Sequence, residues 1–310
     1  MTAPLIDPFA RTIDYLRVSV TDRCDFRCVY CMSENMQFLP KKDLLSLEEL
    51  DRLCTAFIGL GVQKLRITGG EPLVRRDILK FFHAMSRHLE AGSLKELTLT
   101  TNGSQLERFA ADLAAAGVRR INVSLDTLDE QKFADITRWG RVPQVLRGID
   151  AAAAAGIPVK VNCVVQRGVN DHEIPDLCAY FRERGHPLRF IEFMDVGNTN
   201  HWTGDRVLPA REIVGLVHAH WPLEAAGPAY RGEVATRYRY RDGRGEIGII
   251  SSVTEPFCRD CHRARLSADG KLYTCLFTSL GWDVLGAARS TRMTDAGLEG
   301  FIRRIWRGRV

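Results

Sequence analysis

The chain has 310 residues, of which 45% are hydrophobic and 26% are charged, as is usual for a soluble globular protein. Its net charge of +5 is too small for a dedicated nucleic-acid binder, although it leaves room for a local basic pocket that faces an anion. No apolar run approaches the ~18 residues of a membrane span, and the N-terminus lacks the profile of a signal peptide. We therefore expect a cytoplasmic protein with no membrane or nucleic-acid partner, built as two domains or as a barrel with an appendage.

Strand and helix patterns alternate along the first 200 residues. Segments rich in Val, Ile, Leu and Thr predict strands at residues 15–20, 64–68, 96–101, 120–125, 159–165 and 188–194. Helical periodicity is present at residues 46–61, 75–92, 105–117, 142–156 and 174–185. Four of these helices end in glycine, where we expect left-handed caps, at Gly61, Gly117, Gly156 and Gly185. A repeated βα unit predicts parallel strands joined by right-handed crossovers.

Six such units are fewer than the eight of a closed barrel. We therefore predict an α/β fold in which residues 1–200 form an open, partial (βα)6 TIM-like barrel, with its chemistry at the carboxyl ends of the strands. Beyond residue 200, segments 236–253 and 264–277 resemble antiparallel strands joined by Asp-Gly turns. Residues 201–310 are expected to form a smaller α+β cap that packs on the barrel.

Nine cysteines are unevenly placed, and six of them fall into two clusters. The first cluster, Cys24, Cys28 and Cys31, follows the first predicted strand with the spacing Cys-x3-Cys-x2-Cys. A structural zinc site would normally add a fourth Cys or His nearby, whereas a [4Fe–4S] cluster held by three cysteines keeps one iron open to another ligand. The missing fourth ligand favours the iron–sulfur cluster.

The second cluster is Cys258, Cys261 and Cys275, again three thiols. A zinc site with three cysteines and His262 is the alternative, but ligation by the neighbours Cys261 and His262 is geometrically awkward. A second [4Fe–4S] cluster with one open iron fits better, and the predicted cap would carry it. The isolated Cys54, Cys163 and Cys178 are expected to be buried small hydrophobic residues.

Basic residues recur on the predicted strands. Arg17, Arg66, Lys160 and Arg189 should project toward one barrel interior, and Arg263 and Arg265 should flank that space from the cap. Inward-facing cations are costly without an anionic partner, so together they indicate a compact polyanion such as a triphosphate.

The cysteine spacing, with Tyr30 before the last cysteine, resembles the signature of radical S-adenosylmethionine (SAM) enzymes. That resemblance implies that SAM chelates the open iron through its methionine amino and carboxylate groups. The turn "GGEP" at 69–72 supports it, because Gly69 and Gly70 permit close backbone approach to a ligand ammonium.

The resemblance extends over residues 11–310 to the GTP 3',8-cyclase family, the molybdenum cofactor biosynthesis protein A enzymes. The segments that carry it are "RVSVTDRCDFRCVYCM", "RITGGEPLVRRD", "LTTNG", "RINVSLDTLD", "VKVNCVVQRGVND", "RFIEFMDVGN" and "CRDCHRARLSADGKLYTCLF". The family's chemistry implies a 5'-deoxyadenosyl radical that abstracts H3' of GTP, after which the sugar carbon attacks C8 of guanine.

Roles for individual residues follow from this resemblance. It implies catalytic roles for the first cysteine cluster and Arg17, and SAM contacts from Tyr30, Gly69, Gly70, Glu71, Ser124 and Met194. It implies GTP contacts from Arg17, Arg66, Thr101, Lys160, Arg263 and Arg265, with Asn162 and Arg189 as further candidates on the same strands. It implies a flavodoxin- or ferredoxin-type electron donor and a downstream cyclic pyranopterin monophosphate synthase, and it is compatible with a homodimer.

One departure from the family concerns the end of the chain. The family closes with a tail ending in two glycines, whereas this sequence ends at Val310 without them. It is either truncated or a variant without the tail, so SAM and GTP binding are expected but productive cyclisation is in question. Two alternatives stay open at this point: a peptide-modifying radical SAM enzyme with an auxiliary cluster, and a non-catalytic iron–sulfur or zinc protein.

Overall fold

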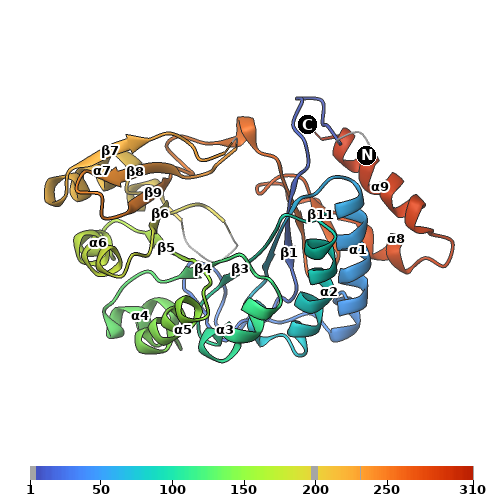
Figure 1. The fold of residues 1–310 in the computed structure, drawn as a ribbon, viewed down its shortest axis with the longest axis horizontal. Coiled ribbons are helices and arrows are strands. Elements are labelled where there is room, and N and C mark those ends of the chain that lie inside the picture. The colour runs from blue at the N-terminus through green and yellow to red at the C-terminus, as the bar shows by residue number, and fades with distance from the viewer. Residues whose placement is uncertain (1–4, 197–201, 231, 310) are drawn as a thin grey trace.

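The computed structural model describes residues 5–196, 202–230 and 232–309. Six parallel strands and the helices between them form an open barrel (Figure 1). The strands are β1 Tyr15–Ser19, β2 Lys64–Thr68, β3 Glu96–Thr101, β4 Arg120–Ser124, β5 Val159–Val165 and β6 Leu188–Glu192. The helices are α1 Leu47–Gly59, α2 Ile78–Glu90, α3 Leu106–Ala115, α4 Glu130–Thr137, α5 Val142–Ala154 and α6 Ile174–Glu183. The predicted partial barrel is confirmed, with each strand boundary within two residues of its prediction.

Local signals set the helix ends. Ser46 forms a capping box with Glu49 at the start of α1. The four glycines predicted to cap helices have φ values of 105°, 77°, 77° and 70°, as expected for left-handed caps. Helix α4 was not predicted, because its eight residues bury only Phe133, Ile136 and Thr137 and so show little periodicity. The side chain of Asp129 starts it by accepting from the Lys132 backbone amide.

The C-terminal part continues the barrel sheet on both edges. Its strands are β7 Leu223–Ala226, β8 Thr236–Tyr240, β9 Glu246–Ile250, β10 Arg263–Leu266, β11 Lys271–Tyr273 and β12 Trp282–Asp283, and its helices are α7 Ala210–His220, α8 Val284–Arg289 and α9 Asp295–Arg307. Strand β9 pairs in parallel with β6, and β10 pairs in parallel with β1, so the described strands form one twelve-stranded sheet. The predicted antiparallel pairs β8–β9 and β10–β11 are present. Figure 1 shows β7, β8 and β9 on one side of the barrel and β11 on the opposite side. The proposed domain boundary at residue 200 lies outside the described residues.

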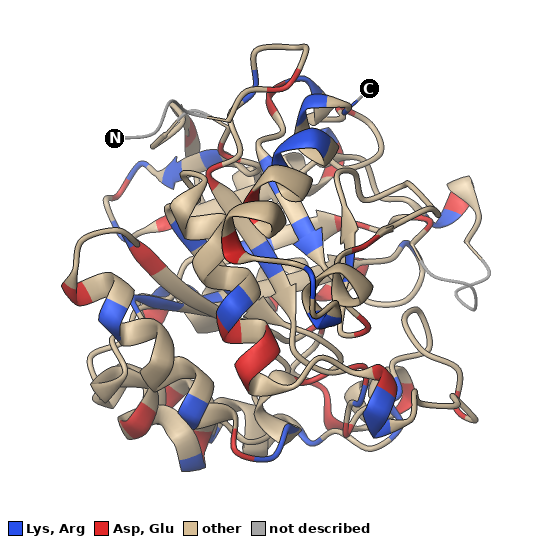
Figure 2. Cartoon of the chain, turned by 90° about the vertical axis from the view of Figure 1, so that its right-hand side faces the viewer, with Lys and Arg blue, Asp and Glu red and all other residues tan. Residues whose placement is uncertain are grey.

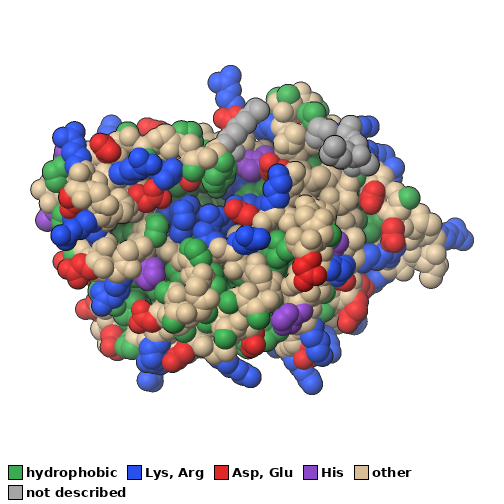
Figure 3. All heavy atoms as spheres, in the orientation of Figure 1, with side chains coloured by type: hydrophobic (Ala, Val, Ile, Leu, Met, Phe, Trp, Pro, Cys, Tyr) green, Lys and Arg blue, Asp and Glu red, His purple; other side chains and the backbone are tan. Residues whose placement is uncertain are grey.

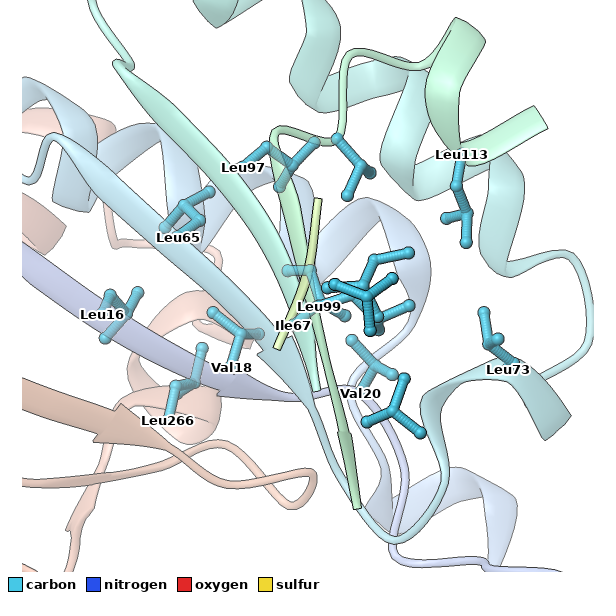
Figure 4. Packing of buried hydrophobic residues seen from close by; sticks show 14 of the residues in the cluster. Leu16, Val18, Val20, Leu65, Ile67, Leu73, Leu97, Leu99, Leu113 and Leu266 are labelled. Atoms are coloured by element: carbon cyan, nitrogen blue, oxygen red, sulfur yellow. The ribbon is translucent and has the colours of Figure 1, made fainter. Parts of the chain in front are cut away.

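The hydrophobic core lies between the outer face of the sheet and the helices. Leu16 and Val18 on β1, and Leu65 and Ile67 on β2, are fully buried there and pack as Figure 4 shows. Because side chains alternate along a strand, the residues between them face the interior of the barrel. The alternation thus leaves Arg17 and Arg66 on the inner face. No described helix is long and apolar enough to cross a membrane.

Candidate active site

A cavity of about 350 Å³ occupies the interior of the barrel. Figure 3 shows basic side chains gathered in a hollow near the middle of one face, and Figure 2 shows Lys and Arg on strands inside the fold. Five arginines line this central cavity: Arg17, Arg66, Arg189, Arg263 and Arg265. Arg17, Arg66, Arg263 and Arg265 lie on the neighbouring strands β1, β2 and β10 and form a cationic wall, whereas Asp126 and Glu233 are the acidic residues among those that line the cavity.

Sheet register brings three of these arginines side by side. Arg17 on β1 pairs with Arg66 on β2 and with Arg265 on β10. Burial and the nearby Arg17 and Arg263 lower the pKa of Arg265 to about 9. No described Asp or Glu forms an ion pair with any of the three. Neighbouring guanidinium groups without acidic partners favour binding of an anion.

Arg66 is held by neighbouring hydroxyls. Its Nε donates to the hydroxyl of Tyr15, and its Nη1 donates to Oγ1 of Thr100 at 3.2 Å. Thr100 lines the central cavity, whereas Thr101 is buried and donates to Glu71 instead. The structure thus separates Thr101 from the cavity. Alternation in "ELTLTT" could have shown this, since Leu97 and Leu99 face the helices and Thr100 faces inward.

Lys160 lies near this cavity without being among the residues that line it. It is half-buried on β5, two residues before Asn162, which does line the cavity. Burial, with Arg189 and Arg120 nearby, lowers the pKa of Lys160 to about 8. Its ammonium therefore titrates within reach of physiological pH.

The first cysteine cluster lies on a loop that follows β1. Backbone amides of Arg27 and Val29 donate to carbonyls of Thr137 and Ile136, each at 2.9 Å, which ties the loop to the end of α4. The Cys24 sulfur accepts from the Phe26 amide at 3.4 Å and from Asn102 Nδ2 at 3.8 Å. Burial raises the pKa of Cys24 to about 12 and also raises that of Cys28 and Cys31, so these thiols need a metal to become thiolates.

The donor set of this loop fits an iron–sulfur cluster. All three cysteines are free of disulfides, although the described residues hold no group of three or more Cys, His, Asp or Glu side chains already gathered closely enough to hold a metal ion. The donors to Cys24 are of the kind that stabilise cluster thiolates. Cys31 is exposed, so one side of the loop is accessible.

The "GGEP" turn packs directly against this loop. The Gly70 amide donates to the Thr21 carbonyl, and the Glu71 amide donates to the Arg23 carbonyl, both at 2.8 Å. A Cβ on Gly69 would lie 2.6 Å from the Thr21 oxygen, and one on Gly70 would lie 2.5 Å from the Arg23 carbonyl carbon. Only glycine permits this approach.

Glu71 faces away from the cavity and holds the turn in place. Its carboxylate accepts from the amides of Leu73 (3.0 Å) and Asn102 (2.6 Å) and from the Thr101 hydroxyl (2.8 Å). Burial raises the pKa of Glu71 to about 7, although these hydrogen bonds favour the charged form. Glu71 and Thr101 thus join the ends of β2 and β3.

Tyr30, Ser124 and Met194 lie toward the cysteine loop end of the central cavity. Ser124 and Met194 line it, and Tyr30 donates to Asp126 Oδ2 at 2.6 Å. Asp126 also accepts from the Val164 amide at 2.8 Å, and burial raises its pKa to about 6. Sequence reasoning assigned no role to Asp126, which fixes the position of Tyr30.

The second cysteine cluster lines an adjoining cavity of about 180 Å³. This cavity shares Met194, Ser252, Phe257, Arg263 and Arg265 with the central one, so the two are neighbours. Burial favours the neutral thiol of Cys261, but Arg263 and Arg309 outweigh it and lower its pKa to about 7. Cys258, Cys261 and Cys275 all line this one cavity.

His262 does not belong to that cysteine cavity. It lines a separate small cavity with Asp14 and Asp260, and its Nδ1 forms a hydrogen bond with the Asp14 carboxylate. The alternative zinc site with three cysteines and His262 is therefore disfavoured by geometry.

Two buried residues that sequence reasoning missed anchor the second cysteine cluster. Glu192, at the end of β6, accepts from the Val253 and Thr254 amides (2.8 and 2.9 Å) in the segment leading to Cys258. Arg309 donates to the Cys261 carbonyl at 2.8 Å and stacks on Trp306. Glu192 lies 61 and 62 residues from Val253 and Thr254, and Arg309 lies 48 residues from Cys261, so only the fold reveals these contacts.

Comparison with known proteins agrees with this geometry. Residues 18–181 match the family model of the radical SAM superfamily, and residues 186–310 match that of molybdenum cofactor synthesis C. The GTP 3',8-cyclase of Paracoccus denitrificans (strain Pd 1222) is 58% identical over 284 residues, covering 88% of this chain and 79% of that protein. The GTP 3',8-cyclase of Acidothermus cellulolyticus (strain ATCC 43068 / DSM 8971 / 11B) is 48% identical, covering 99% of this chain and 86% of that protein.

A solved structure, Streptococcus suis SuiB bound to S-adenosylmethionine, shares the fold. Its TM-score is 0.64 at 17% identity, and the match covers 94% of this chain and 67% of that chain. At this identity the likeness concerns the fold alone. The sequence relatives and the two family models decide the family: the chain belongs to the GTP 3',8-cyclase family of the radical SAM superfamily.

Proposed function

We propose that this protein converts GTP to (8S)-3',8-cyclo-7,8-dihydroguanosine 5'-triphosphate, the first step of molybdenum cofactor biosynthesis. Membership of the family implies SAM, a [4Fe–4S] cluster and GTP as substrate. The observation that best supports the proposal is the row formed by Arg66, Arg17 and Arg265 in a cavity that adjoins the second cysteine cluster.

Cys24, Cys28 and Cys31 would hold the first cluster. The close-packed glycines of the "GGEP" turn would bring backbone groups to the methionine end of SAM, and Glu71 would fix the turn from behind. Tyr30, Ser124 and Met194 would contact SAM from the loop, β4 and the end of β6. Hydrogen bonds of Tyr30 to Asp126 and of Glu71 to the ends of β2 and β3 would help to hold SAM in one orientation.

The triphosphate would lie on the cationic wall of the cavity. Its ligands would be Arg17, Arg66, Lys160, Arg189, Arg263 and Arg265, with Thr100 in place of Thr101 beside Arg66. Guanidinium groups suit phosphate oxygens because they donate in a planar fork. The anion would also offset the repulsion among the neighbouring arginines, which gives a reason for the cluster's existence.

A second [4Fe–4S] cluster on Cys258, Cys261 and Cys275 is part of the proposal. Three ligands would leave one iron for the guanine edge, next to the arginines that the two cavities share. When bound, the first cluster and SAM would supply the 5'-deoxyadenosyl radical needed to abstract H3' of GTP. The chain's own residues would then have to orient the sugar and guanine and to exclude water from the reacting atoms.

Further partners are proposed from the same assignment. They are a flavodoxin- or ferredoxin-type electron donor and a downstream cyclic pyranopterin monophosphate synthase, with no nucleic acid or membrane partner. A cytoplasmic location and a homodimer are compatible with this scheme.

The decisive experiment is anaerobic reconstitution with SAM and a strong reductant, with and without GTP, followed by mass spectrometry. We expect 5'-deoxyadenosine and the cyclised nucleotide, and a parallel sample with a peptide ending in Gly-Gly tests the family's tail requirement. SAM cleavage with GTP untouched in both samples would leave the radical SAM fold correct and refute the proposed substrate.

Cys275→Ala should distinguish the role of the second cysteine cluster from that of the first. The first site stays intact, so uncoupled SAM cleavage continues, whereas iron falls from about eight to about four per chain and GTP conversion falls roughly a hundredfold or more. Iron analysis and product quantification check this. Wild-type GTP consumption by Cys275→Ala would contradict the role given to the second cluster.

GTP affinity should fall as the pH rises through 8. Lys160 has a pKa lowered to about 8 in the free protein, and a bound triphosphate raises it, so binding takes up a proton and is strongest below pH 8. Between pH 7 and 9 we expect the dissociation constant to rise roughly fivefold. Calorimetric titration of the unreduced protein measures it.

Lys160→Arg is the matched control, because its guanidinium keeps its charge over this range. The ratio of wild-type to Lys160→Arg affinity should therefore decline from pH 7 to 9. A constant ratio would exclude Lys160 from the GTP site.

A further inference from the structure

Asn122 is a buried polar side chain to which the roles above assign nothing. It lies on β4, is 6% exposed and lines the central cavity. Its Oδ1 is buried and has no hydrogen-bond partner in the described part of the chain. Buried polar groups are nearly always paired, so a ligand group is expected at this position.

The required partner is a group that carries a hydrogen. An amide oxygen with no donor costs free energy, and placing a phosphate oxygen against it would add repulsion. Exchanging the amide oxygen and nitrogen would leave an unpaired donor at the same position. A hydroxyl satisfies either orientation, because it can both donate and accept.

The position of Asn122 in the sheet says which part of a nucleotide reaches it. In register it pairs with Thr100 on β3, whose hydroxyl accepts from Arg66, and with Lys160 on β5. One inward-facing position further along β4 is Ser124, assigned above to SAM. Asn122 therefore lies between the cationic wall and the SAM contact.

A second unpaired amide lies next to it. Asn162 on β5 lines the same cavity and pairs in register with Ser124 and Arg189, and no described residue forms a hydrogen bond with its buried Oδ1. Two acceptors on adjacent strands match neighbouring hydroxyls better than a single group. The sugar of a nucleotide, which joins its phosphates to its base, carries such a pair.

We propose that Asn122 is a specificity-determining residue that hydrogen-bonds a ribose hydroxyl of the nucleoside triphosphate, and so distinguishes it from a deoxynucleotide. This rests on the proposed function, because GTP has to occupy the central cavity. The contact would hold the sugar between the triphosphate site and SAM, where its 3' hydrogen has to be presented.

The test compares binding of GTP, 2'-deoxy-GTP and 3'-deoxy-GTP to the reconstituted, unreduced protein in the presence of SAM, by calorimetry. Wild type should bind at least one deoxy analogue roughly tenfold more weakly than GTP, since the missing hydroxyl leaves Asn122 unpaired. In Asn122→Ala that ratio should fall to about one, because GTP loses the same contact. Asn122→Ser gives the same comparison if the alanine variant does not fold.

Arg265→Ala is the control, since it should weaken the binding of all three nucleotides by a similar factor and preserve the ratio of deoxy-analogue to GTP affinity. Equal wild-type affinity for all three nucleotides would overturn the inference, and so would an unchanged ratio in Asn122→Ala. Either result would leave the proposed function standing. Failure of the wild-type protein to bind GTP would instead refute the proposed function itself, and the inference with it.

Discussion

Cys24→Ala is expected to abolish SAM cleavage. Cys24 is one of three ligands on the first loop, and its sulfur already accepts from the Phe26 amide and Asn102. Loss of a residue that only supports a ligand costs roughly 10- to 100-fold, so loss of a ligand itself should exceed about a hundredfold. The measurements are 5'-deoxyadenosine formation and iron content, which should fall from about eight to about four per chain.

Cys54→Ala is the matched control for that experiment. Cys54 is fully buried in α1, away from both cysteine clusters, and packs as a small hydrophobic side chain. The Cys54→Ala variant should keep the iron content and the SAM cleavage rate of the wild type. Unchanged iron in Cys24→Ala would remove Cys24 from the ligand set.

Gly70→Ala should disrupt the SAM site through the backbone. The new Cβ would overlap the Arg23 carbonyl and lie 2.8 Å from the Asp22 oxygen, so the turn or the start of the cysteine loop has to move. We expect the free energy of unfolding to fall by about 3 kcal/mol, the upper end of the usual range for overpacking, because the new Cβ meets backbone atoms. Thermal denaturation of the metal-free protein and SAM titration of the reconstituted protein should both show a loss.

Gly215→Ala serves as the control for Gly70→Ala. Gly215 is exposed within α7, and a Cβ there would meet nothing within 4 Å. Alanine should stabilise the helix by about 0.5–1 kcal/mol and leave SAM binding unchanged. Wild-type iron content and SAM affinity in Gly70→Ala would show that the turn does not position the cysteine loop.

Interior positions on the strands were predictable where alternation is clear. In "RINVSL", Ile121 and Val123 are fully buried under the helices, which leaves Asn122 and Ser124 facing inward. The same rule places Thr100 in the cavity and turns Thr101 toward Glu71. The resemblance alone had favoured Thr101, since homology does not state which of two adjacent threonines faces in.

The sequence by itself determined the order of the barrel strands, the glycine caps and both cysteine triplets. These depend on short-range properties, namely hydrophobic period, permitted φ values and cysteines close together in the chain. Only the tertiary structure decided that β9 and β10 extend the barrel sheet and that Arg265 lies beside Arg17, about 250 residues earlier in the chain. It alone decided that Glu192 and Arg309 anchor the second cysteine cluster. Such contacts follow from sheet register and closure, which depend on the whole chain packing at once.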